Sequence, residues 1–159
     1  MKASEWAQRK AESISAAREA SSVEAALKLE RLNIRKANFP DLVQSVHDAF
    51  SAYCEEYNKR RPAGDKSLHY IAMSGTLSLL KRDAGFSEIH VRVNFAARTM
   101  RVTAHNCSFQ YDHLYRPEAT DDGGALFLCS GNGCLITPDD VAQMAMDAFL
   151  DGHEMAMRL

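Results

Sequence analysis

Strict alternation of apolar and polar residues marks two stretches in the middle of the chain. Residues 88–95, EIHVRVNF, and residues 99–105, TMRVTAH, place every second side chain on an apolar face. This period of two is the pattern of a strand that buries one side. A connecting loop with an even number of residues keeps both apolar sets on the same face. With Ala97 and Arg98 as the loop, the predicted register pairs Phe95 with Met100, Val93 with Val102 and Val91 with Ala104.

Helical patterns precede this pair of strands. Residues 4–36 contain neither glycine nor proline and are rich in Ala, Glu, Lys, Arg and Leu, which favours a long helix. Residues 40–58 carry apolar side chains at steps of three and four, which predicts a second helix. Because Pro40 disfavours helix in the residue before it, we expect a break there and a helical hairpin within residues 1–62. The apolar face of the second helix consists of Leu42, Val43, Val46, Phe50, Tyr53 and Tyr57.

The first predicted helix has an uneven apolar face. Its second half carries a stripe of Val23, Leu27 and Ile34 with Leu32 beside it, whereas its first half offers Trp6, Ile14 and small alanines. A single helix cannot bury its own apolar face, so we expect this helix to pack along a partner helix or a second copy of the chain.

The rest of the chain predicts further strands and one more helix. Residues 68–85 fit either strand alternation or a short strand to about Met73 followed by a short helix closed by Gly85, and we favour the second description. A third strand follows a turn near Asn106, and residues 125–136 form a hairpin. The last helix begins after Thr137, a good helix cap. Its predicted buried stripe is Val141, Met144, Ala145, Ala148 and Phe149.

These elements predict a single α+β domain over residues 1–159. A helical hairpin (residues 1–62) and a C-terminal helix (residues 138–152) should cover one face of a mainly antiparallel sheet of four or five strands (residues 63–137). The apolar faces of the alternating strands need such a cover.

Composition narrows the functional classes. Hydrophobic residues make up 46% and charged residues 25% of the chain, which is typical of globular domains. No apolar run approaches a membrane span, and the N-terminus MKASEWAQRK lacks the apolar core of a secretory signal, so we expect a cytoplasmic location. The net charge is −2, and the short basic runs are diluted by acids, so we expect no nucleic-acid partner.

The segment CSGNGC, residues 129–134, contains the strongest candidate for site chemistry. If residues 131–132 or residues 130–133 form the loop, Cys129 and Cys134 lie opposite each other, whereas a turn at Asn132 and Gly133 separates them. In the first arrangement, His105 and Cys107 complete a candidate zinc site, with His90 or His113 in reserve. The competing interpretation is a hydrophobic hairpin whose cysteines are small buried side chains.

The polar face of the alternating strands is a second candidate site. The predicted register places His90 opposite His105, Arg92 opposite Thr103 and Asn94 opposite Arg101. This polar and basic face is either solvated or used by a ligand or protein partner. Its candidate residues are His90, Arg92, Asn94, Arg101 and His105.

Catalytic motifs are missing from the sequence. It contains no H-E-x-x-H, no G-x-S-x-G, no complete dinucleotide loop and no Walker lysine, and a catalytic pairing of His90 or His113 with Asp112 has no spacing in its favour. We therefore predict a non-catalytic binding or adaptor module without cofactor that associates with itself or another protein. The alternative is a metal- or thiol-site protein that uses the cysteine hairpin.

Overall fold

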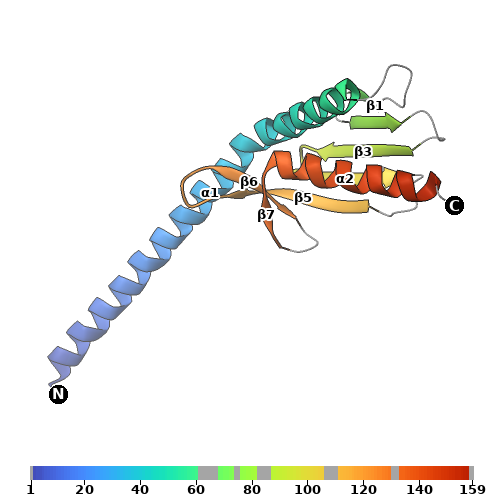
Figure 1. Ribbon diagram of the computed structural model, residues 1–159. Helices are drawn as coiled ribbons and strands as arrows, with labels where there is room; N and C mark the ends of the chain where they lie inside the picture. Colours follow the sequence, from blue (N-terminus) through green and yellow to red (C-terminus); the bar gives the residue numbers. More distant parts are fainter. Residues whose placement is uncertain are drawn as a thin grey trace.

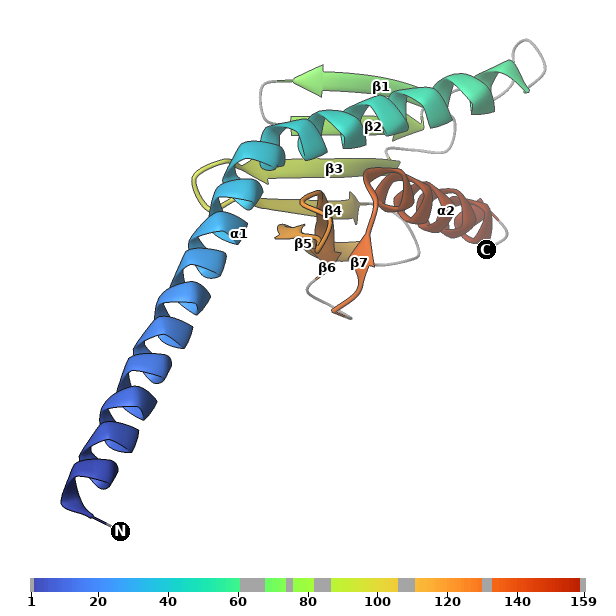
Figure 2. The same ribbon diagram turned by 90° about the vertical axis from the view of Figure 1, so that its left-hand side faces the viewer.

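The computed structural model describes residues 2–60, 68–73, 76–81, 87–105, 111–129 and 133–157. Two helices, α1 (Ala3–Lys59) and α2 (Pro138–Met157), pack against an antiparallel sheet (Figure 1). The chain therefore has the α+β fold that the sequence predicts, with the second half of α1 and all of α2 on one side of the sheet (Figure 2).

Within the described residues, the sheet is a meander of seven strands in which each strand pairs with the next one along the chain. It is wider than the predicted four or five strands because residues 68–81 provide two strands. The short helix expected after Met73 is replaced by a strand, since the alternation of this stretch prevails over its capping signals. The strands are β1 (Leu68–Met73), β2 (Thr76–Lys81), β3 (Ser87–Asn94), β4 (Thr99–His105), β5 (Tyr111–Ala119), β6 (Ala125–Cys129) and β7 (Leu135–Ile136).

Helix α1 runs through Pro40 without a break, so the predicted helical hairpin is wrong. A proline inside a helix removes one backbone hydrogen bond and costs about 3 kcal/mol, usually with a bend. Figure 2 shows such a bend where α1 reaches the sheet. Phe39 and Leu42, on either side of the proline, are buried. Their burial contributes about 1.5–3 kcal/mol each, which offsets the cost of keeping the helix continuous.

The hairpin of β3 and β4 has a four-residue loop, residues 95–98, in place of the predicted two-residue loop. Arg98 adopts a positive φ of 52°, and the Ala97 N–H donates to Asn94 Oδ1 at 2.9 Å. Because the loop length is even, the apolar sets still share one face. The partners shift by two residues, however, so that Val93 pairs with Met100, Val91 with Val102 and Ile89 with Ala104.

The hydrophobic core lies between the sheet and the two helices. Thr137 caps α2 as predicted, because its Oγ1 accepts the Asp140 N–H at 3.1 Å. On α2 the predicted core residue Met144 is exposed, and Met146 is buried in its place. The largest fully buried side chains are Tyr115, Phe39, Phe50, Phe127, Phe149, Ile89, Met100 and Val46.

Candidate interaction surfaces

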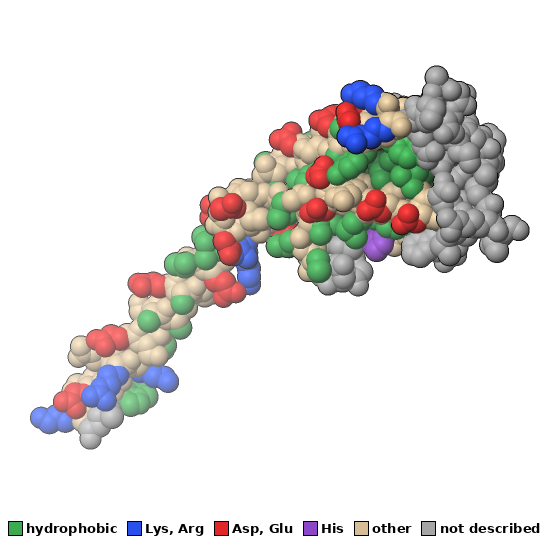
Figure 3. Space-filling view, in the orientation of Figure 1, with side chains coloured by type: hydrophobic (Ala, Val, Ile, Leu, Met, Phe, Trp, Pro, Cys, Tyr) green, Lys and Arg blue, Asp and Glu red, His purple; other side chains and the backbone are tan. Residues whose placement is uncertain are grey.

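The first 29 helical residues of α1 project away from the sheet. Every residue from 3 to 31 is exposed, and we call this segment the arm (Figures 1 and 3). At about 1.5 Å per residue, the arm is about 43 Å long. Its large apolar side chains are Trp6, Ile14, Val23, Leu27 and Leu29, with exposed fractions from 47% to 61%.

One side of the arm has the spacing of a helix-pairing seam. Ser13, Ala16, Ala20, Val23 and Leu27 follow one another at alternating steps of three and four. Such a repeat places its side chains in one row along the helix, with small residues in the middle and larger ones toward the sheet. The described residues of the sheet and of α2 do not cover this row, since the whole arm is exposed.

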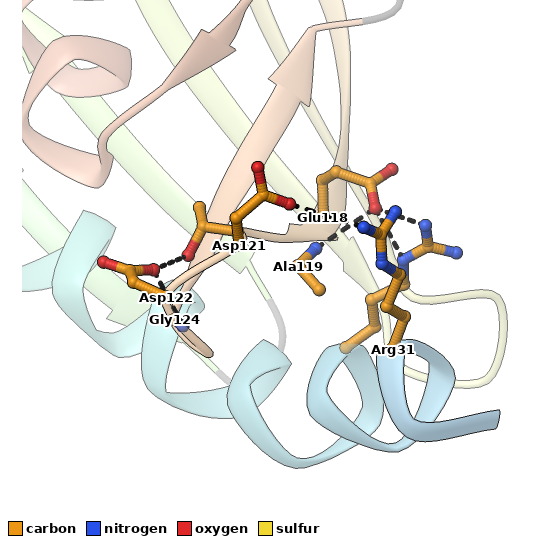
Figure 4. Close-up of polar contacts among 8 residues, drawn as sticks. Arg31, Glu118, Ala119, Asp121, Asp122 and Gly124 are labelled. Atoms are coloured by element: carbon orange, nitrogen blue, oxygen red, sulfur yellow. Dashed lines mark hydrogen bonds and ion pairs between the residues drawn. The ribbon is translucent and has the colours of Figure 1, made fainter. Parts of the chain in front are cut away.

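Ion pairs hold the base of the arm against the turn that joins β5 and β6 (Figure 4). The Arg35 guanidinium donates from Nε and Nη2 to Glu118 Oε1, with 2.9 Å from Nε, and Arg31 Nη2 lies 3.4 Å from Asp121 Oδ1. The Arg35 and Glu118 side chains are only 35% and 26% exposed, whereas Asp121 is almost fully exposed. The pair of Arg35 and Glu118 is therefore the stronger of the two contacts.

The turn itself is ordered by its own hydrogen bonds. Asp122 accepts the Thr120 hydroxyl and, at 3.2 Å, the Gly124 N–H. These two hydrogen bonds, the Thr120 bond first, lower the pKa of Asp122. Gly123 has a φ of 83°, which suits glycine. The turn thus presents Glu118 and Asp121 to α1 from a fixed backbone.

The predicted ligand face lies on the side of β3 and β4 opposite to the core. Because Ile89, Val91, Met100 and Val102 are buried, the alternate residues of these strands face away from the helices. We call this side of β3, β4 and β5 the outer face.

The pairings across the outer face differ from the predicted ones. Arg92 lies directly opposite Arg101, and the other pairs are His90 with Thr103, Asn94 with Thr99 and Glu88 with His105. The predicted pairs were wrong because the loop is two residues longer than expected. The side chain of His105 lies outside the described part of the structure.

Two acidic residues contact basic side chains of the outer face. His90 Nε2 lies 2.6 Å from Glu88 Oε2, and Arg101 Nε lies 3.6 Å from Asp112 Oδ1. Arg116 on β5 is exposed on the same face, although it was not among the predicted residues. The alternation of YDHLYR signals this position, but Pro117 follows it and obscures the strand.

The strands β6 and β7 flank the predicted cysteine hairpin CSGNGC. Phe127 pairs with Ile136 and Leu128 with Leu135, and Cys129 and Cys134 are the next residues toward the loop on the two sides. Residues 130–132, which include most of the predicted loop, lie outside the described residues. Cys134 is exposed, whereas Cys107 and the side chain of Cys129 lie outside the described residues.

The structure does not bring His105 to this cysteine pair. Cys129 pairs with Tyr115, which in turn pairs with Met100 on β4. His105 is five residues further along β4, which corresponds to about 17 Å along the strand. Within the described ranges, no group of three His, Cys, Asp or Glu side chains is arranged to hold a metal ion.

The remaining candidates for reactive side chains, His113, Asp112 and Cys54, take part in ring packing, an ion pair and the buried core. The His113 ring packs 4.4 Å from that of Tyr111 and 6.1 Å from that of Tyr115. Asp112, which precedes it, points to the opposite side of the strand and pairs with Arg101. Burial raises the pKa of the Cys54 thiol to about 12, so this cysteine is not a nucleophile at neutral pH.

A shallow groove of about 180 Å³ lies between the C-terminal part of α1 and α2. Its lining includes Tyr53, Tyr57, Met146 and Leu150, with charged residues such as Arg60 at the rim. Tyr53 also joins the two helices, because its hydroxyl donates to Asp139 Oδ2 at 3.0 Å. This groove is smaller than the cavities that enclose drug-sized ligands.

No helix in the described ranges combines the length and the apolar character needed to cross a membrane. No protein-family model, curated protein or solved structure matches the chain.

Proposed function

We propose that this chain is a non-catalytic binding module that associates with a second copy through the arm and presents the outer face to a partner. The observation that carries the proposal is the arm, a long helical segment whose apolar side chains have no cover within the described part of the chain.

The arm gains stability from a partner helix. Isolated helices in water are marginal even when they are rich in alanine, because most helical stability in proteins comes from packing an apolar face. The arm has a few internal supports, such as the Glu24–Lys28 ion pair at 2.8 Å. Five large apolar side chains remain about half exposed, and burying the rest of each contributes on the order of 1 kcal/mol.

A second copy fits the seam because it carries the same row of side chains. In an antiparallel pair, Ala16 of one copy packs against Ala20 of the other, and the small side chains allow close approach. In that register, Lys10 lies beside Glu24 of the second copy, so that opposite charges meet twice across the two-fold axis. The antiparallel orientation also keeps the two sheets at opposite ends of the pair.

Substituting the seam tests the self-association. The double variant Val23→Asp with Leu27→Asp places two charges in the seam, and we expect it to be monomeric where the unchanged chain is a dimer. Light scattering coupled to size-exclusion chromatography measures the mass, and sedimentation equilibrium measures the dimer Kd. We expect the Kd to rise more than about a hundredfold, since two charges would be buried.

The matched control is Ser15→Asp with Ser22→Asp, which adds the same charge to exposed positions of the arm away from the seam. This control should remain dimeric, with circular dichroism confirming that both variants stay folded. A monomeric unchanged chain, or dissociation of the control alone, would refute the proposed seam.

The cysteine hairpin supports a second candidate function, a thiol or metal site in which Cys129 and Cys134 act together. The pairing of Leu128 with Leu135 supports this candidate, because Cys129 and Cys134 are the next residues toward the loop on the two sides. In the reducing cytoplasm that we propose as the location, such a pair would be thiols or metal ligands. Elemental analysis of protein purified without chelator should find stoichiometric zinc or iron if the candidate is correct, and a metal-free protein with unchanged melting on chelation rejects the metal site.

A further inference from the structure

Three arginines form a compact group on the outer face. Arg92 on β3 and Arg101 on β4 are direct cross-strand partners. Arg101 in turn pairs with Leu114 on β5, so Arg116, two residues beyond Leu114, lies diagonally to Arg101 on the same face. Side chains at direct and diagonal positions of neighbouring strands are within reach of one another. We call Arg92, Arg101 and Arg116 the arginine group.

The charge of this group is incompletely balanced. Arg101 lies near Asp112, at 3.6 Å, and both side chains are more than half exposed. Within the described residues, Arg92 and Arg116 take part in no ion pair. Like charges placed directly opposite each other destabilise a sheet. A dianionic group held between Arg92 and Arg101 would remove this repulsion.

We propose that the arginine group binds a phosphorylated side chain of a protein partner. This proposal rests on the proposed function, since it names the partner chemistry of the outer face. A phosphate ester carries nearly two charges and three acceptor oxygens, which match paired guanidinium groups. The Asn94 side chain is exposed at the same end of the strands, and its Nδ2 group can add a neutral donor.

The shape of the surface favours a peptide over a small molecule. Ligand pockets enclose most of a small molecule, but the outer face belongs to an open sheet, and the groove described above lies between the helices on the other side. Leu114 pairs with Arg101 and is half buried on this face, and Leu135, which is 48% exposed, lies two strands beyond Arg116 in the same row, so an extended peptide would find apolar contacts on this side of the sheet.

Nucleic acid fits the same surface less well. Phe, Tyr and Trp side chains for base stacking are absent from the described positions of the outer face. Asp112 lies beside Arg101 and Glu88 lies further along β3, beyond His90, and both would repel a phosphate backbone that follows the strands. A single phosphate group held between Arg92 and Arg101 meets Asp112 alone, whereas an extended phosphate backbone along the strands would meet both acids.

The probe is a fluorescently labelled peptide of glycine and alanine with one central phosphoserine, titrated with the full-length protein at low and at physiological salt. Fluorescence anisotropy gives the Kd. We expect Arg92→Ala and Arg101→Ala each to raise the Kd about three- to tenfold, and Arg116→Ala to raise it less. Asp112→Asn should lower the Kd, because it releases Arg101. Arg98→Ala, which removes an arginine from the loop, is the control and should leave the Kd unchanged.

Competing probes separate the other ligands. The unphosphorylated peptide should not bind, and inorganic phosphate should bind more weakly than the phosphopeptide. Equal binding of inorganic phosphate, tighter binding of single-stranded DNA, or a Kd that is insensitive to Arg92 and Arg101 would overturn the proposal. The monomeric seam variant should bind the phosphopeptide with an unchanged Kd, so failure of the arm to associate and failure of the arginine group are distinguishable.

Discussion

At the scale of single residues, Asn58 joins the end of α1 to the edge of the sheet. Its Nδ2 donates to the Leu68 carbonyl and its Oδ1 accepts the Leu68 N–H, both at 2.8 Å. Leu68 begins β1, whose pairing partner in the described structure is β2 alone. The asparagine amide therefore satisfies two backbone groups of a buried residue that a further strand would otherwise satisfy.

Substitution of Asn58 by alanine should destabilise the fold. The change leaves the N–H and the carbonyl of Leu68 without this partner at a buried position, so we expect the free energy of unfolding to fall by about 1–3 kcal/mol. Urea denaturation followed by circular dichroism measures this difference. Asn33→Ala, at an exposed position of the same helix, is the control and should change stability by less than about 0.5 kcal/mol. Equal effects of the two substitutions would contradict the role of Asn58.

At the scale of elements, the features that depend only on residues close in the sequence were predicted from local patterns. The alternation of residues 88–95 and 99–105 predicted β3 and β4, because every second side chain faces the same buried layer. The cap at Thr137 predicted the start of α2, since the hydrogen bond that closes the cap spans three residues. The outer face followed from the same alternation.

Features that depend on distant contacts were predicted wrongly. Local propensity predicts a break at Pro40, but the burial of Phe39 and Leu42 against the sheet keeps α1 continuous. The partner of Arg92 also depends on the length of the loop at residues 95–98. A two-residue loop and a four-residue loop both keep the apolar residues of β3 and β4 on one face. In the observed four-residue loop, the ring of Phe95 contacts that of Phe39, with centroids 5.8 Å apart. Sequence alone does not contain that contact.

At the scale of the whole molecule, two features set the direction in which the arm leaves the sheet. The bend near Pro40 turns the helix away (Figure 2), and the contact of Arg35 with Glu118 holds the segment just beyond the bend. The arm carries the proposed pairing seam, whereas the arginine group lies on the sheet. A fixed angle between the arm and the sheet would fix the relative orientation of the two outer faces in a dimer.

A double-mutant cycle on Arg35 and Glu118 measures how firmly the arm is held. We expect Arg35→Ala, Glu118→Ala and the double variant to give a coupling energy of about 1 kcal/mol, because both side chains are partly shielded from solvent.

The exposed pair of Glu24 and Lys28, in the same helix, is the control, with an expected coupling of about 0.3–0.5 kcal/mol. Hydrogen exchange gives an independent measure, since amides between the arm and Pro40 should lose protection in Arg35→Ala and keep it in Lys28→Ala. If the two couplings are equal and this protection is unchanged, the ion pair does not hold the base of the arm, and the bend at Pro40 alone sets its direction.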